Sequence, residues 1–129
     1  MKPKLTFLLA LTIIFCSTLS VNAAANKYSC NVKDFHTGTD SKTEFIASNL
    51  RKKYLITVDE KKIFMTQISS EYRNAQMIFE IIGRNKLGIY SMEKSSIGFN
   101  TLIFHEMSGS ASMVVQTFAG ANAWMLECK

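Results

Sequence analysis

The sequence contains few of the residue types that usually build metal and catalytic sites. Histidine occurs only twice, at His36 and His105. No His-x-His, Cys-x-x-Cys or His-Glu-x-x-His spacing is present, so nothing in the sequence supports a zinc site. A Gly-x-Ser-x-Gly nucleophile motif and a phosphate-binding glycine loop are also missing. We therefore expect a protein without catalytic residues, metal or cofactor.

Proline is also scarce, since the single proline is Pro3. Proline cannot donate to a β-ladder and is confined to strand edges, strand starts and bulges. No proline therefore interrupts any apolar run in the rest of the chain. We also find no internal repeat, low-complexity tract or linker, which predicts a single domain.

The first 23 residues have the layout of a secretory signal peptide. A short basic start is followed by an apolar run over 5–19, and Val21-Asn22-Ala23 supplies small residues before a cut. The run is shorter than the ~18–20 residues that cross a bilayer, which argues against a membrane anchor. A lipoprotein cut before Cys16 is disfavoured by bulky Ile14 and Phe15. We expect a secreted or periplasmic protein with no stable membrane span after cleavage.

Cleavage after Ala23 leaves one β domain over 24–129, 106 of the 129 residues, and lowers the formal net charge from +5 to +3 because Lys2 and Lys4 are removed. Cys16 is also removed, so Cys30 and Cys128 remain as the only pair. In an oxidising compartment two cysteines predict one disulfide between the ends of the domain. A domain of this size buries a modest share of its surface, so such a crosslink helps to stabilise it.

Short runs with alternating apolar residues recur every ~10–13 residues, separated by polar or glycine-containing turns. This spacing is typical of an antiparallel all-β meander of about seven or eight strands. Cys30 shares a strand face with Tyr28 and Val32, and Cys128 shares one with Trp124 and Leu126. The expected strands are 28–32, 54–58, 63–69, 76–82, 87–92, 101–107, 113–118 and 123–128, with turns at 36–40, 59–62, 83–86, 94–98, 108–110 and 120–122 and a longer connection over 70–75.

Residues 41–50 fit two interpretations. Ser41-x-x-Glu44 could be a capping box that opens a short helix, with Ile46 and Leu50 four residues apart. A strand over 43–47 fits the segment as well. We favour the strand, because a helix of fewer than ~12 residues is marginal without strong packing.

The disulfide bears on how the meander closes. Its two Cα atoms must lie within ~7 Å, so the first and last strands are neighbours or face one another. Neighbouring strands would close the sheet and remove its free edges. We therefore expect a closed or nearly closed small barrel, with a two-layer sandwich as the alternative.

Five residues are candidates for contact with a ligand or partner: His105, Trp124, Arg51, Lys52 and Lys53. His105 and Glu106 are adjacent, and adjacent residues of a strand point to opposite faces, so they cannot form an acid–base pair without a bulge. His105 fits a strand end or a polar group inside a barrel cavity. Trp124 is expected to pack beside the disulfide. The basic run 51–53, together with Lys61 and Lys62, could form one electrostatic patch or ordinary solvated turns.

The overall plan, a short exported β domain tied by one disulfide, is similar to that of the small periplasmic β-barrel inhibitors of lysozyme. Those proteins carry a serine–glycine loop followed by a tyrosine, and a tryptophan–lysine–glycine segment. Here Ser108-Gly109-Ser110-Ala111 is followed by Met113, and no such tryptophan segment is present. The resemblance is therefore one of plan, and it transfers no residue role.

Three functions remain open. The first and favoured one is a non-catalytic binding protein of the cell envelope or exterior, with a protein or glycan partner contacted through the loops at one end. The second is a carrier of a small apolar ligand inside the barrel, lined by Met and Phe with one polar group such as His105. The third is a hydrolase that brings scattered Ser, His and Glu residues together. The small positive charge and the expected export argue against a nucleic-acid partner.

Overall fold

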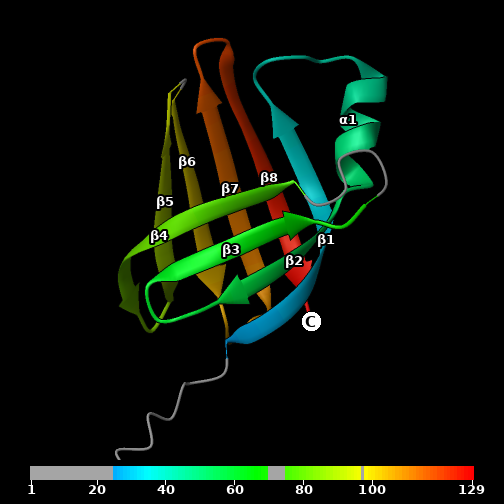
Figure 1. The fold of residues 1–129 in the computed structure, drawn as a ribbon. Helices are drawn as coiled ribbons and strands as arrows, with labels where there is room; N and C mark the ends of the chain where they lie inside the picture. The colour runs from blue at the N-terminus through cyan, green and yellow to red at the C-terminus, as the bar shows by residue number, and fades with distance from the viewer. Residues whose placement is uncertain (1–24, 70–74, 97) are drawn as a thin grey trace, which may run out of the picture.

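The computed structural model describes residues 25–69, 75–96 and 98–129, which form eight antiparallel strands and one short helix. Each strand pairs with the next along the chain, and β8 pairs with β1, so the sheet is a closed barrel (Figure 1). The expected signal peptide and most of the connection at 70–75 lie outside the described residues. The elements are β1 (Asn26–Thr37), α1 (Thr43–Leu50), β2 (Lys53–Val58), β3 (Lys62–Gln67), β4 (Gln76–Asn85), β5 (Gly88–Ser95), β6 (Gly98–His105), β7 (Ser110–Thr117) and β8 (Gly120–Cys128).

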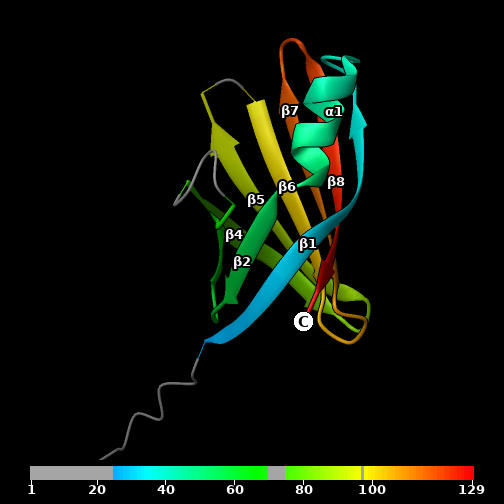
Figure 2. The same cartoon turned by 90° about the vertical axis from the view of Figure 1, so that its right-hand side faces the viewer.

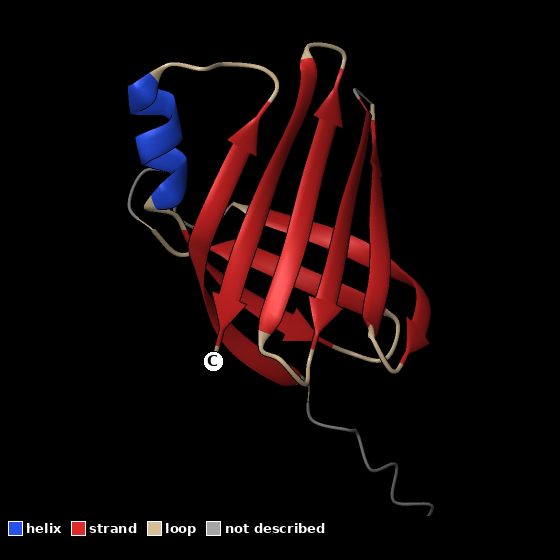
Figure 3. Ribbon diagram, turned by 180° about the vertical axis from the view of Figure 1, so that it is seen from behind, coloured by secondary structure: helices blue, strands red, loops and turns tan. Residues whose placement is uncertain are grey.

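The barrel is flattened into two groups of strands that cross. Strands β5–β8 run side by side, and β2–β4 pass across their inner side (Figures 1 and 3). Strands β1 and β4 belong to both groups, and each has a register shift where it changes group, between Val32 and Asp34 and between Ile81 and Gly83. β-Bulges of this kind bend a strand and form the corners of orthogonally packed sheets.

The disulfide is formed as the sequence predicts. Cys30 and Cys128 are register partners on β1 and β8, with Cα atoms 4.0 Å apart and a sequence separation of 98. The first and last strands are therefore hydrogen-bonded neighbours. The expectation of a closed barrel is confirmed, and the sandwich alternative is wrong.

Inward-facing apolar side chains fill the part of the barrel where the two groups of strands overlap. Tyr54, Ile56 and Val58 of β2 and Phe79 of β4 are buried inside the barrel. These residues belong to one core cluster with the disulfide. The largest fully buried side chains are Phe79, Phe104, Ile56, Ile63, Met65, Leu102, Met113, Asn49 and Cys30.

Residues 43–50 form helix α1, so the prediction of a strand there is wrong. The capping box is absent too, because the N-cap is Lys42 and no side chain caps the helix; Asp40 instead accepts a hydrogen bond from the Lys42 N–H. The helix lies beside the second half of β1 (Figure 2). Phe45 and Ile46 pack against the core, and this tertiary contact stabilises a helix that would be marginal alone.

The strands extend further than the hydrophobic pattern predicts, and several turns are shorter. His36 belongs to β1 rather than to a turn, and Gly83 lies within β4, whose turn into β5 falls at Lys86 and Leu87. Similarly, β8 already begins at Gly120. The reason is that backbone pairing continues into polar residues at strand ends, where hydrophobic periodicity gives no signal.

Gly109 meets a specific backbone requirement in the turn between β6 and β7. Its φ is +62°, and a Cβ there would lie 2.6 Å from the Cys128 carbonyl oxygen. The Cys128 N–H donates to the Gly109 carbonyl oxygen at 2.6 Å. Only glycine fits this close approach without strain, so the turn is joined to the last strand next to the disulfide.

Candidate functional site

His105 ends β6 and is half-buried, as expected for a strand end that reaches solvent. Its Nδ1 lies within hydrogen-bond distance of the Leu87 carbonyl oxygen on the neighbouring turn. Glu106 is exposed and accepts a 3.4 Å hydrogen bond from the Tyr28 hydroxyl. His105 and Glu106 thus contact different residues, and His105 does not enter the barrel interior.

Trp124 is buried, but it packs at the helix rather than beside the disulfide. Its indole N–H donates to the Asn49 Oδ1 at 3.2 Å, and its ring centroid lies 4.9 Å from that of Phe35. Four residues along a strand separate it from Cys128, which corresponds to ~13 Å. The Nζ of Lys52 lies 5.7 Å from the indole centroid, so the structure does bring these two candidate residues together.

Arg51, Lys52 and Lys53 link α1 to β2, and Arg51 and Lys53 are exposed. The Lys53 N–H donates to Ser69 Oγ at 3.3 Å. Strands β2 and β3 pair as a hairpin with Lys61 and Lys62 at its turn, so these lysines lie at the opposite end of the hairpin from the run 51–53. The suggestion that the two basic segments form one patch is therefore wrong. His105 lies on the same pairing row as Lys53 but four strands away around the barrel.

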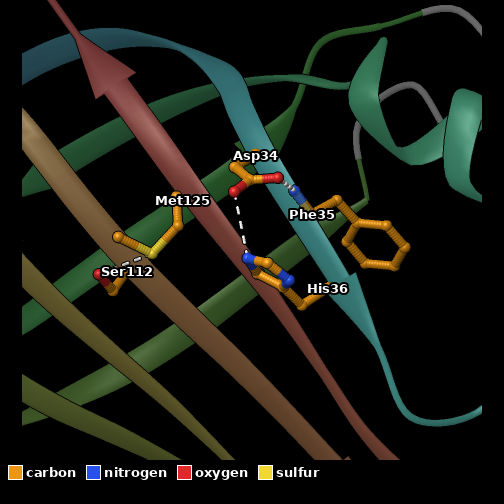
Figure 4. Close-up of polar contacts among 5 residues, drawn as sticks. All are labelled: Asp34, Phe35, His36, Ser112 and Met125. Atoms are coloured by element: carbon orange, nitrogen blue, oxygen red, sulfur yellow. Dashed lines mark hydrogen bonds and ion pairs between the residues drawn. The ribbon is translucent and has the colours of Figure 1, made fainter.

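An ion pair joins His36 Nε2 and Asp34 Oδ2 at 3.1 Å, on the outside of β1 (Figure 4). Ser112 is the nearest serine on the same outer face, and it hydrogen-bonds to the Met125 sulfur instead. Met125 lies between Ser112 and Asp34 in the pairing register. Two strand spacings of ~4.8 Å therefore separate the serine from the acid, too far for a nucleophile–base contact.

A ligand cavity inside the barrel is one of the sequence-based alternatives, but the described Met and Phe side chains that would line it lie in the packed core. Met65, Met113, Phe79 and Phe104, which would line it, are at most 1% exposed and pack in one cluster. Hollows of about 360 and 240 Å³ lie instead at the disulfide end, and both are lined by charged residues. They share Arg84 and Glu106, and the smaller one is also lined by the exposed Leu87 and Met107.

Among the residues that the structure describes, Tyr54, Tyr28 and Asp59 have pKa values that depart from their ordinary ones. Burial raises the pKa of Tyr54. Burial, and then the nearby Glu106 carboxylate, raise the pKa of Tyr28. The Lys62 and Lys61 N–H groups hold the pKa of Asp59 below its usual range, at hydrogen-bond distances of 2.7 and 2.8 Å. The Asp59 interaction stabilises the β2–β3 turn.

The outer face of β5–β8 is a surface that the sequence did not single out (Figure 3). Adjacent outward positions on four strands carry no charged side chain, and the exposed Phe99 and Met125 are among them. We call this set the uncharged outer face. It comprises Tyr90, Met92, Phe99, Thr101, Ile103, Ser112, Val114, Gln116, Ala121, Ala123 and Met125.

Charged residues surround this face, with Lys94, Glu127 and Asp34 at its borders. On the outer face of β2–β4, the oppositely charged residues Lys62 and Glu80 are register partners on adjacent strands. Exposed sheet faces of monomeric proteins normally carry polar and charged residues. A charge-free outer face of this extent is typical of the centre of a protein interface.

A second surface faces inward near α1. One residue from each of five neighbouring strands forms a single pairing row, and every member is half-buried. We call this the inner polar row: Glu93, Asn100, Val115, Asn122 and Thr37. The sequence alternation places Glu93 on the same face as Ile89 and Ser91. Only the strand register shows that the polar residues are side by side.

Comparison with protein-family models, curated proteins and solved structures finds no match. The described residues contain no group of three or more His, Cys, Asp or Glu that could hold a metal ion. No helix within 25–69, 75–96 and 98–129 is long and apolar enough to cross a membrane. The features that bear on function are therefore the two surfaces, the uncharged outer face and the inner polar row.

Proposed function

We propose that this chain is an exported, non-catalytic binding protein that contacts a protein partner through the uncharged outer face of β5–β8. The observation that carries the proposal is the absence of charge across neighbouring outward positions on four strands. Interface centres are depleted in charged residues and enriched in aromatic residues and Met, and this face contains Tyr90, Met92, Phe99 and Met125. The partner therefore presents a matching apolar surface.

Two further observations support a binding role over the alternatives. The core residues that would line a carrier cavity are packed against each other, which disfavours a small apolar ligand in the interior. Among the described residues, the serine nearest to the His36–Asp34 pair on the outer face is Ser112, which lies two strands away from Asp34, and this disfavours a hydrolase. The disulfide is consistent with an oxidising compartment, and export through cleavage after Ala23 remains part of the proposal.

The test is native mass spectrometry of the protein purified from the exported fraction. We compare the wild type with Val114→Lys, at the centre of the uncharged outer face, and with Thr66→Lys, an outward position on β3. Both positions are half-buried and β-branched, so the two variants are matched. The expected result is a protein complex in the wild type and in Thr66→Lys that is lost in Val114→Lys.

Other outcomes contradict the proposal. A complex that survives Val114→Lys places the contact elsewhere on the molecule. A small apolar molecule bound to the wild type would favour the carrier. Detection of the uncleaved chain, with both cysteines reduced, would remove the argument for export.

A further inference from the structure

The burial of inward-facing residues changes abruptly at the inner polar row on β5–β8. The next row toward the disulfide end, which runs from Ser91 to Phe35, is buried at every position. One step further toward α1, the inward residues are only half-buried, and four of the five are polar. These side chains point to the inside of the sheet and still reach solvent.

Two polar groups flank an apolar centre in this row. On one side, Asn100 Nδ2 donates to Glu93 Oε2 at 2.7 Å. On the other, Asn122 Oδ1 accepts a hydrogen bond from Thr39 Oγ1 at 3.0 Å. Val115 lies between the two asparagines, which are two strands apart and hence ~10 Å from each other.

Each of the two groups keeps unused hydrogen-bonding capacity. Within the part of the chain that the structure describes, the Asn122 Nδ2 and the Asn100 Oδ1 make no hydrogen bond to protein. The Glu93 carboxylate has further acceptor sites beyond the one used by Asn100. The row therefore offers donors and acceptors at both ends.

The chemistry of the row excludes several ligand classes. An anion would meet the Glu93 carboxylate without any Lys or Arg in the row. A metal ion would need more ligating groups than the single carboxylate supplies. A purely apolar ligand would leave the amides and the carboxylate unpaired, which is costly.

We propose that the inner polar row binds a neutral saccharide of about two linked sugar rings. Hydroxyl groups both donate and accept hydrogen bonds, so they match a set of amide and carboxylate groups. The methyl groups of Val115 lie where the apolar face of a ring would pass between the two polar ends. The saccharide would occupy the side of the sheet opposite the uncharged outer face, so this proposal is independent of the protein partner.

The experiment is a titration followed by amide NMR, with cellobiose, maltose and N,N′-diacetylchitobiose as the probes. We expect at least one disaccharide to shift the amide signals of the inner polar row. Asn122→Ala removes one polar end and should weaken that binding about three- to tenfold. Gln116→Ala removes a carboxamide from the outward side of β7 and should leave the affinity unchanged.

A second variant guards against loss of structure at Asn122. Asn100→Ala removes the other polar end and should weaken binding by a similar factor, with the amide spectrum of the rest of the barrel unchanged. The proposal is overturned if none of the three disaccharides shifts the row at millimolar concentration. Shifts confined to the outer face, or equal losses in Asn122→Ala and Gln116→Ala, would also overturn it. Val114→Lys should not affect saccharide binding, which separates this result from that of the protein partner.

Discussion

The two ends of the barrel interior differ although the same strands build both. At the disulfide end, inward residues such as Phe104 and Leu102 are fully buried because β2–β4 cross over them. At the helix end, the inward Asn100 on the same strand is half-buried and polar. The comparison shows that an inward direction does not by itself determine burial. The opposing group of strands decides how far along β5–β8 the apolar core extends.

Loss of the disulfide is expected to lower the free energy of unfolding more than any other change considered below. Replacing both Cys30 and Cys128 by alanine removes a crosslink spanning 98 residues, for which chain entropy predicts a loss of up to about 4–5 kcal/mol. Urea unfolding of the double variant beside the oxidised wild type measures this. An unchanged free energy of unfolding would show that pairing of β1 with β8 alone closes the barrel.

Two substitutions on β6 test the difference between the ends directly. Phe104→Ala opens a cavity in the buried cluster and should cost about 3–5 kcal/mol. Asn100→Ala, at an inward position near α1, should cost about 1 kcal/mol or less, because solvent reaches the site. Thermal and urea unfolding of both variants measure the contrast. Similar losses would contradict the view that the opposing strands set the limit of the core.

The contact of α1 with β8 is expected to have an intermediate effect. Asn49 is 2% exposed, and it accepts from the Trp124 indole and donates to the Phe45 carbonyl oxygen at 3.0 Å. Asn49→Ala leaves the buried indole N–H without its partner and should cost about 1–3 kcal/mol. A double-mutant cycle with Trp124→Phe should give a non-zero coupling energy. Additive losses would mean that the hydrogen bond does not hold the helix.

The smallest effect is expected at the β2–β3 turn, and it should depend on pH. The pKa of Asp59 is lowered in the folded protein by the Lys62 and Lys61 N–H groups. Its stabilising effect is therefore fully present above the unfolded value of about 3.9 and is lost as the pH falls through the folded pKa. Asp59→Ala should lower the urea midpoint more at pH 7 than at pH 2. Asp59→Asn keeps an acceptor oxygen, so it should lower the urea midpoint less than Asp59→Ala does.

The sequence contained enough information for the fold class but not for all of its elements. The short alternating runs at 54–58 and 76–82 predicted strands that the structure has as β2 and β4, since local periodicity reflects which side of a strand is buried. Helix α1 was one of two interpretations of residues 41–50 and was not the favoured one, because its stability comes from the contacts of Phe45 and Asn49 with distant strands. The turn at Gly83 was placed too early because the β-ladder continues through residues without hydrophobic alternation.

The two candidate surfaces, unlike the fold class, could not be predicted from the sequence. The sequence by itself determined the all-β pattern, the pairing of Cys30 with Cys128 and the scarcity of histidine, because these depend on local order and on counting. Only the tertiary structure decided that Glu93, Asn100 and Asn122 form one row and that Val114 lies at the centre of a charge-free face. Such sets depend on strand register, which hydrogen bonds between distant segments fix and which one-dimensional spacing does not record.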